Sequence, residues 1–212
     1  MEKLFENNRI VPVVVINDVD KAIKLAETLL ECGINNMEVT LRTPSALDVI
    51  RRISQNLPEM VMGAGTILCK EQFSDAIDAG AKFVISPGIT NELSSYAQSH
   101  ISKVHYIPGI CTPSQAMEAA NAGFNHVKFF PAEAYNAYNV IKALASPLPH
   151  IKFCPTGGIT IDNMGKYLEL SNIFAVGLSS IVDAKLIEAG DFAEIRKRCE
   201  QAVDIDRQAI IK

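Results

Sequence analysis

Residues 37–53, MEVTLRTPSALDVIRRI, contain the unit from which the fold of the whole chain is predicted. Polar and apolar residues alternate over residues 37–41, which is typical of a strand. After an exit at Arg42-Thr43-Pro44, the apolar residues between Ala46 and Ile53 recur at helical spacing. A strand followed directly by a helix is the repeating unit of a parallel α/β sheet.

The same unit recurs along the chain roughly every 21 to 25 residues, about the length that one strand, one short helix and two tight loops require. We predict strands at residues 10–16, 37–41, 60–63, 83–86, 104–107, 126–130, 151–154 and 173–176. Gly33, Gly80 and Gly123 each follow a segment of helical periodicity, where glycine supplies the left-handed conformation that ends a helix. The last segment, residues 192–211, predicts an amphipathic helix that covers the sheet.

Strands that alternate with helices, without a linker or a change of composition, predict one α/β domain over residues 1–212, a parallel (β/α)8 TIM barrel. The alternative, an open doubly wound sheet, predicts G-x-G-x-x-G after the first strand. Residues 16–18 read Ile-Asn-Asp there, and the glycine pair at Gly63 and Gly65 lacks the third glycine. The barrel is therefore favoured.

Composition excludes several classes of function. A net charge of −4 argues against nucleic acid as the main partner. Five cysteines without a C-x-x-C pair indicate free thiols in a reducing compartment, and the four histidines show no metal-binding spacing. The N-terminus lacks the apolar run of a signal peptide, and the longest apolar stretch, residues 10–16, is too short to cross a bilayer. We expect a cytoplasmic protein without a membrane partner or a metal.

The strand predicted at residues 126–130 carries a lysine that points into the barrel. Val127 and Phe129 pack outward by alternation, which leaves His126, Lys128 and Phe130 on the inner face. Lysines on strands more often protect an exposed edge. Here the neighbours are apolar, and a lysine that loses its hydration is easily converted to the neutral amine, the species that attacks carbonyl groups.

Other polar residues follow the strands at their carboxyl ends, where barrels of this kind place their chemistry. Glu38 and Arg42 share the inner face of their strand, as an internal ion pair or as site residues. Thr66 offers a hydroxyl to a carboxylate. Small residues at 155–159 and 177–180 indicate an anion cradle, because backbone N–H groups of such loops bind phosphate after the last two strands of these barrels.

Six segments at the ends of predicted strands carry a family resemblance: EVTLRT (38–43), GAGT (63–66), ISPG (85–88), PGI (108–110), KFFPAE (128–133) and PTGGI (155–159). In this order, along nearly the whole chain, they resemble the 2-keto-3-deoxy-6-phosphogluconate (KDPG) aldolase family. That family also contains 4-hydroxy-2-oxoglutarate (KHG) and phosphogalactonate aldolases. The resemblance implies a class I aldolase that needs no metal or other cofactor, cleaves a keto-acid sugar phosphate to pyruvate and glyceraldehyde 3-phosphate, and forms a homotrimer.

The resemblance also implies a role for each site residue. Lys128 forms the Schiff base and Glu38 is the general acid and base. The implied substrate-binding residues are Arg42 and Thr66 at the pyruvate carboxylate, Pro87 and Phe130 as walls of the pocket, and Thr156 as a hydrogen-bonding group. The implied phosphate-binding residues are Gly157, Gly158, Gly177 and Ser179.

Two departures from the family pattern bear on the phosphate site. Leu178 stands where a second glycine is common, so its side chain is expected to crowd the cradle or to change the backbone angle. Residues 134–139 lack the paired glycines often found there. An aldolase for KHG or for the phosphogalactonate epimer therefore stays open as an alternative. More remote alternatives are a phosphosugar isomerase or epimerase and a sugar-phosphate binding protein, neither of which needs an inward lysine.

Overall fold

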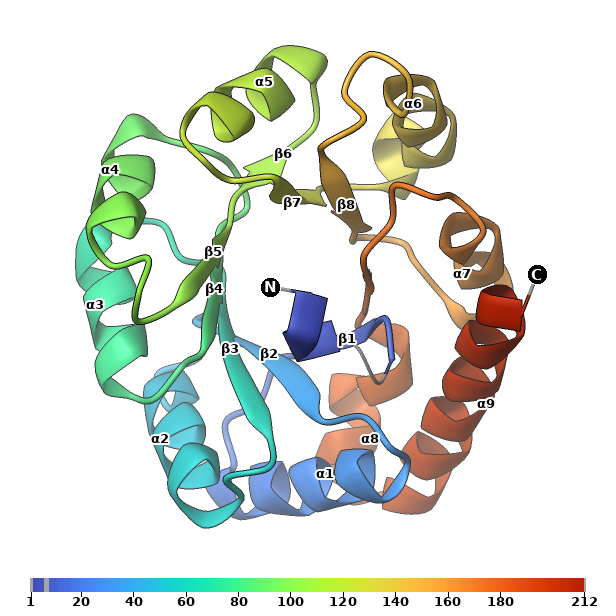
Figure 1. The fold of residues 1–212 in the computed structure, drawn as a ribbon. Coiled ribbons are helices and arrows are strands. Elements are labelled where there is room, and N and C mark those ends of the chain that lie inside the picture. Colours follow the sequence, from blue (N-terminus) through green and yellow to red (C-terminus); the bar gives the residue numbers. More distant parts are fainter. Residues whose placement is uncertain (1, 6–7, 212) are drawn as a thin grey trace.

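The computed structural model describes residues 2–5 and 8–211. Positions 1, 6, 7 and 212 of the predicted domain lie outside these described residues. Strands form an inner ring and helices surround it (Figure 1). Figure 1 views this cylinder along its axis. The chain thus has the alternation of strand and helix that its sequence predicts.

The strands are Ile10–Val14 (β1), Asn36–Thr40 (β2), Val61–Gly65 (β3), Phe83–Ile85 (β4), His105–Ile107 (β5), Gly109–Ile110 (β6), His126–Phe129 (β7), Lys152–Pro155 (β8) and Val176–Leu178 (β9). The α-helices are Val19–Glu31 (α1), Ala46–Asn56 (α2), Lys70–Asp78 (α3), Asn91–Ser99 (α4), Pro113–Asn121 (α5), Ala137–Leu144 (α6), Ile161–Leu168 (α7), Ala184–Ala189 (α8) and Phe192–Ile211 (α9). Short 3-10 helices occur at Glu2–Phe5 (η1), Glu133–Tyr135 (η2) and Ser180–Val182 (η3).

All strand pairs are parallel, and they fall into two hydrogen-bonded groups. One has the order β5-β4-β3-β2-β1-β9 and the other the order β6-β7-β8. Isolated bridges from Phe153 to Ile173 and from Thr156 to Gly177 connect β8 to the segment that contains β9. β5 and β6 follow each other directly, with only Pro108 between them. The result is a parallel α/β fold whose sheet curls around an axis.

The predicted strands match β1 to β5, β7 and β8 to within two residues at each end, whereas β6 was not predicted and the last strand is shifted. The ladder with β1 begins only at Val176, which pairs with Ile10, so β9 is Val176–Leu178 and not residues 173–176 as predicted. Ile173 makes a single bridge to Phe153 instead. The segment is apolar throughout and fully buried, so alternation could not fix its register. Gly33, Gly80 and Gly123 have φ of 82°, 102° and 88°, as their predicted helix-ending role requires.

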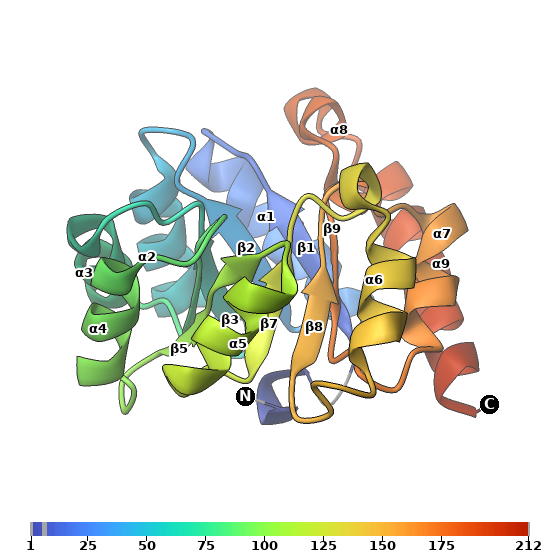
Figure 2. The ribbon, with the colours of Figure 1, turned by 90° about the horizontal axis from the view of Figure 1, so that it is seen from above.

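Aromatic side chains fill one end of the cylinder. Phe5, on η1, packs against Phe83 and Phe174 with ring centroids 5.7 Å and 5.6 Å away. These rings belong to a buried cluster separate from the larger core that lies between the sheet and the helices. Figure 2 shows η1 at one end of the sheet and α8 at the opposite end. Because side chains fill the η1 end, we expect a ligand to bind at the opposite end, where the strands finish.

The final helix is fastened to the first strand by a buried ion pair. The guanidinium Nε of Arg9 lies 2.8 Å from Oδ1 of Asp206, and the backbone N–H of Arg9 donates to Oδ2 at 2.9 Å. Asp206 is only 2% exposed. The pair holds α9 across the start of β1, as the predicted covering role of this helix requires. Within residues 2–5 and 8–211, none of the helices combines the length and the apolar character needed to span a bilayer.

We expect Asp206→Ala to lower the free energy of unfolding by about 2–3 kcal/mol, because it leaves the Nε–H and the backbone N–H of Arg9 without their carboxylate acceptor. Asp204→Ala is the matched control on the same helix, since Asp204 is 68% exposed and lies 3.8 Å from Arg207. Its cost should stay within about 0.5 kcal/mol. Urea unfolding of both variants measures the difference, and equal costs would contradict a role for the buried pair.

Candidate active site

A buried amine and a buried carboxylate meet inside the cylinder. Nζ of Lys128, on β7, lies 3.2 Å from Oε1 of Glu38, on β2, and donates a hydrogen bond to it. The two side chains are 7% and 1% exposed. Both inward orientations predicted from the alternation of the strands are confirmed. Two opposite charges removed from water stabilise each other only in such a direct contact.

The local sequence explains why both side chains point inward. Val39 on β2 and Val127 on β7, like the other outward residues, belong to the core under the helices, so their neighbours face the axis. β3 lies beside β2 and carries glycine on the same inner face. A Cβ at Gly65 would overlap the carboxylate of Glu38. Gly65 therefore makes room for the carboxylate of Glu38.

Several neighbours of Lys128 are uncharged. Its Nζ lies 5.4 Å from the centroid of the Phe130 ring, a cation–π distance. Gly109 and Cys154 are its partners in register on the adjacent strands β6 and β8. Burial raises the pKa of the Cys154 thiol to about 12, although the charge of Lys128 opposes the shift. Cys154 is thus a neutral neighbour of the amine.

Cys154 was not among the predicted site residues, although the alternation of side chains along its strand indicates that it faces inward. Phe153 packs outward in the main core, so alternation along β8 places Cys154 on the inner face. Its side chain also contacts Thr156, with Sγ 3.9 Å from Oγ1.

Arg42 and Thr66, predicted to act together, are in contact. Nε of Arg42 donates to Oγ1 of Thr66 at 3.2 Å. Thr66 directly follows β3 and has a φ of 61°, a left-handed conformation that is uncommon for a β-branched residue. Arg42 follows β2 by two residues and is exposed. Both side chains therefore lie at the carboxyl ends of neighbouring strands, with the guanidinium open to a small anionic ligand.

Pro87 lies after β4, in a loop that is stabilised by hydrogen bonds of the buried residue before it. The buried hydroxyl of Ser86 lies 2.7 Å from the carbonyl oxygen of Gly88 and 2.7 Å from the hydroxyl of Tyr106. A Cβ at Gly109 would overlap the backbone of Pro87. Since Gly109 is the register partner of Lys128, Pro87 lies one strand away from the amine, and its ring is exposed.

The loops after β8 and β9 lie against each other. Thr156 forms a bridge with Gly177, and a Cβ at Gly177 would overlap the Thr156 side chain. The hydroxyl of Ser180 also lies 3.4 Å from the carbonyl oxygen of Ile159. The two small-residue segments predicted to form one cradle are thus neighbours. Gly177 itself is part of β9, whereas the prediction placed it in the loop that follows, beside the exposed Ser179.

The Gly157-Gly158 pair requires glycine at both positions. Their φ values are 97° and 80°. A Cβ at Gly157 would lie 3.2 Å from the Phe130 ring, and one at Gly158 would lie 2.8 Å from Cβ of Glu133. The backbone of this loop therefore packs directly onto the segment that follows the lysine strand.

Leu178 does not crowd the cradle, and that expectation was wrong. Leu178 ends β9 with its side chain fully buried in the core between the sheet and the helices. Alternation turns it away from the inner face on which Gly177 lies. In the segment that lacks glycines, Asn136 takes a left-handed conformation with a φ of 50°. Asparagine tolerates that conformation better than most residues, so the turn forms without glycine.

Glu133, which follows the lysine strand, makes structural contacts. The hydroxyl of Tyr167 donates to its carboxylate, and Nζ of Lys166 lies 3.4 Å away. These contacts join η2 to α7 behind the glycine loop. Among the residues that the structure describes, no group of three or more His, Cys, Asp and Glu side chains is placed to hold a metal ion.

This arrangement suits covalent chemistry on a carbonyl compound. An amine that can pass its proton to an adjacent carboxylate becomes a nucleophile, and the same carboxylate can then move protons on the bound substrate.

Comparisons with known proteins agree with this chemistry. A sequence model of the family described as KDPG and KHG aldolase matches residues 1–198. The chain is 42% identical over 202 residues to a 2-dehydro-3-deoxy-phosphogluconate aldolase of Pseudoalteromonas atlantica, covering 95% of this chain and 93% of that protein. It is 39% identical over 203 residues to the KHG/KDPG aldolase of Escherichia coli, covering 96% and 94%.

Among solved structures, the chain is similar to a KDPG aldolase from Legionella pneumophila. That crystal structure captured pyruvate as a covalent carbinolamine intermediate. It superimposes with a TM-score of 0.91 at 40% identity, covering 95% of this chain and 97% of the other.

Proposed function

Because this chain belongs to the KDPG and KHG aldolase family, we propose that it is a class I aldolase, a carbon–carbon lyase. Its substrate is 2-keto-3-deoxy-6-phosphogluconate, and its products are pyruvate and glyceraldehyde 3-phosphate. The observation that carries the proposal is the buried contact between Lys128 and Glu38. A lyase that works through a Schiff base needs such an amine beside a proton acceptor.

The first steps belong to Lys128. Its ammonium group passes a proton to Glu38 along the 3.2 Å hydrogen bond, which leaves a neutral amine. The amine nitrogen adds to the C2 carbonyl carbon of the substrate. Glu38 then gives its proton to the departing hydroxyl group, so that loss of water leaves a protonated imine and a Glu38 carboxylate. Burial of Lys128 among Phe130, Cys154 and Gly109 favours formation of the neutral amine, because an uncharged amine needs little hydration.

Glu38 performs the following proton transfers. As a carboxylate it accepts the proton of the C4 hydroxyl group while the C3–C4 bond breaks, and the imine takes up the electron pair as an enamine. Glyceraldehyde 3-phosphate then leaves, and Glu38 returns its proton to the enamine carbon. Hydrolysis releases pyruvate and frees Lys128. One carboxylate serves first as base and then as acid.

The substrate-binding roles follow from the positions of the side chains. Arg42 and Thr66 hold the carboxylate of the keto acid, which is supported by their mutual contact and by the open guanidinium. Phe130 and Pro87 form the walls of the pocket on either side of Lys128. Thr156 offers its hydroxyl to the bound substrate.

The phosphate group lies in the cradle formed by Gly157, Gly158, Gly177 and Ser179. Support comes from the contact between the two loops and from the positive φ of both loop glycines. Backbone N–H groups of such small-residue loops bind phosphate. Leu178 does not interfere, because its side chain packs into the core.

Architecture and assembly belong to the same proposal. We propose that β5 and β6 act as one strand interrupted at Pro108, so that the sheet closes as a (β/α)8 barrel. The bridges at Phe153 and Thr156 support the closure. We also propose a homotrimer in the cytoplasm that takes a keto-acid sugar phosphate, as the family resemblance implies.

KHG is the second candidate substrate, and the double name of the Escherichia coli relative favours it. KHG lacks a phosphate group, so its cleavage would use Lys128, Glu38 and Arg42 but not the glycine cradle. The phosphogalactonate epimer would use the same site with the opposite configuration at C4.

Borohydride reduction in the presence of pyruvate tests the covalent step. We expect an increase of about 72 Da on Lys128, the mass of a reduced pyruvate imine, found by intact mass and peptide mapping. Lys128→Met should abolish the adduct. Lys82→Met is the control, because Lys82 is exposed, and this variant should still form the adduct. An unmodified Lys128 would exclude an aldolase of this class and favour an isomerase or a binding protein.

Glu38→Gln should lower kcat by about 100- to 10,000-fold, because glutamine cannot accept the C4 hydroxyl proton. Glu133→Gln is the matched control, since this carboxylate lies near the same site but makes structural contacts. We expect its kcat to fall by no more than a few fold. A near-normal kcat for Glu38→Gln in steady-state cleavage assays would remove Glu38 from the mechanism.

Gly158→Ala should reduce kcat/KM for the phosphorylated substrate by at least about 10-fold and spare that for KHG, because the added Cβ would press on Glu133 and displace the cradle. Gly33→Ala carries a similar backbone strain, with a φ of 82°, and has no atom within 4 Å of the added Cβ. It should affect both substrates alike. Equal cleavage of phosphorylated and unphosphorylated 2-keto-3-deoxygluconate by the unaltered protein would contradict the cradle.

A further inference from the structure

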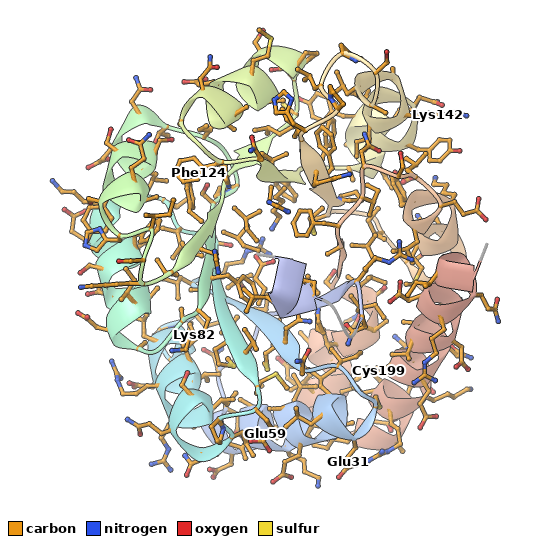
Figure 3. The ribbon with its side chains drawn as sticks, in the orientation of Figure 1. Glu31, Glu59, Lys82, Phe124, Lys142 and Cys199 are labelled. Atoms are coloured by element: carbon orange, nitrogen blue, oxygen red, sulfur yellow. The ribbon has the colours of Figure 1, made fainter. Side chains whose placement is uncertain are left out.

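Two cysteines meet where the last helix packs against the first, far from the amine and carboxylate pair. Cys32 is the C-terminal cap of α1 and is half-buried. Cys199 lies within α9 and is fully buried. Figure 3 labels Cys199 and Glu31, the last residue of α1, in the same part of the molecule.

Contacts on both sides fix the two thiols relative to each other. Sγ of Cys32 lies 3.8 Å from the carbonyl oxygen of Arg196, one turn before Cys199 on α9. The thiols of Cys32 and Cys199 also lie close enough for each to influence the pKa of the other. Arg196 in turn forms an ion pair with Glu31 across the same junction. The two thiols therefore belong to one helix–helix junction.

We propose that Cys32 and Cys199 are a modification site, a thiol pair that forms a reversible disulfide with a low-molecular-weight disulfide as its oxidant. The crosslink would join α1 to α9 and enclose residues 32–199, most of the chain. It is independent of the proposed aldolase function, because neither sulfur belongs to the catalytic or substrate-binding set.

The reaction balances in two exchange steps. The thiolate of Cys32 attacks one sulfur of the small disulfide, which forms a mixed disulfide and releases one small thiol. The thiolate of Cys199 then attacks the Cys32 sulfur, which forms the protein disulfide and releases the second small thiol. Two protein thiols are oxidised and one disulfide is reduced. Cys32 reacts first because it is the more exposed of the two.

Protonation makes the pair slow but pH-responsive. Burial raises the pKa of both thiols, that of Cys199 to about 12. Arg196 lowers the pKa of Cys32, whereas Glu31 and Glu200 raise it. Since the thiolate is the attacking species, the rate of crosslinking should rise with pH over the range below these pKa values. At neutral pH the reduced pair therefore persists during brief exposure to an oxidant.

The other cysteines supply an internal control. Cys69 precedes α3 and Cys111 follows β6, and both are half-buried. A double variant, Cys69→Ser with Cys111→Ser, leaves the pair intact and removes the other half-buried thiols. Cys154 stays unchanged, since it lies beside Lys128.

The experiment equilibrates the double variant with glutathione disulfide at pH 8.5 and measures the intact mass before and after the remaining thiols are blocked. We expect a loss of about 2 Da before blocking and a peptide that joins Cys32 to Cys199. The thermal midpoint should rise by roughly 5–10 °C and return on treatment with dithiothreitol, because the crosslink restricts the unfolded chain.

Two further variants, each carrying one of the two cysteines, make the result decisive. Cys32→Ser and Cys199→Ala should each abolish the mass loss, and Cys199→Ala should stop at the mixed disulfide on Cys32. A persistent mixed disulfide in the double variant would overturn the proposal. So would an unchanged mass at pH 8.5, or a linked peptide that contains Cys154.

Discussion

The contact between Lys128 and Glu38 is the constraint on which the rest of the site depends. Two charges in a dry interior are costly unless they are paired, and here each is the other's partner at 3.2 Å. The hydrogen bond that joins the two groups is also the path of the proposed proton transfer. Stability and chemistry therefore require the same geometry. A strand that slipped by one residue would turn either side chain into the apolar layer under the helices.

The cylinder is filled with aromatic rings at one end and carries glycines on its inner face nearer the other. Phe5, Phe83 and Phe174 fill the end of the cylinder where η1 lies. Closer to the carboxyl ends of the strands, glycine occupies inner-face positions where a larger side chain would overlap a neighbour. At Gly65 that neighbour is the Glu38 carboxylate. The loops that would receive a ligand extend beyond the opposite ends of the strands. Packing at one end thus directs the chemistry to the other.

The C-terminal helix α9 is joined both to the start of β1 and to the end of α1. Asp206 binds Arg9 at the start of β1, and Cys199 meets Cys32 at the end of α1. The C-terminal helix therefore closes the layer of helices through an ion pair and a thiol contact. Neither reaches the amine and carboxylate pair, so the stability of this junction and the chemistry of the site can change separately.

The sequence alone determined the succession of strands and helices, the inward face of Lys128 and Glu38, and the small-residue loops. Each of these depends on a local repeat, period two for strands and the left-handed glycine for helix ends. It could not place Leu178 or the start of β9, because that segment is apolar throughout and only pairing with Ile10 sets its register. It could not show the 3.2 Å contact across 90 residues or the meeting of Cys32 with Cys199. Distances between side chains far apart in the chain follow from how the sheet curls and the helices pack, and no local pattern encodes them.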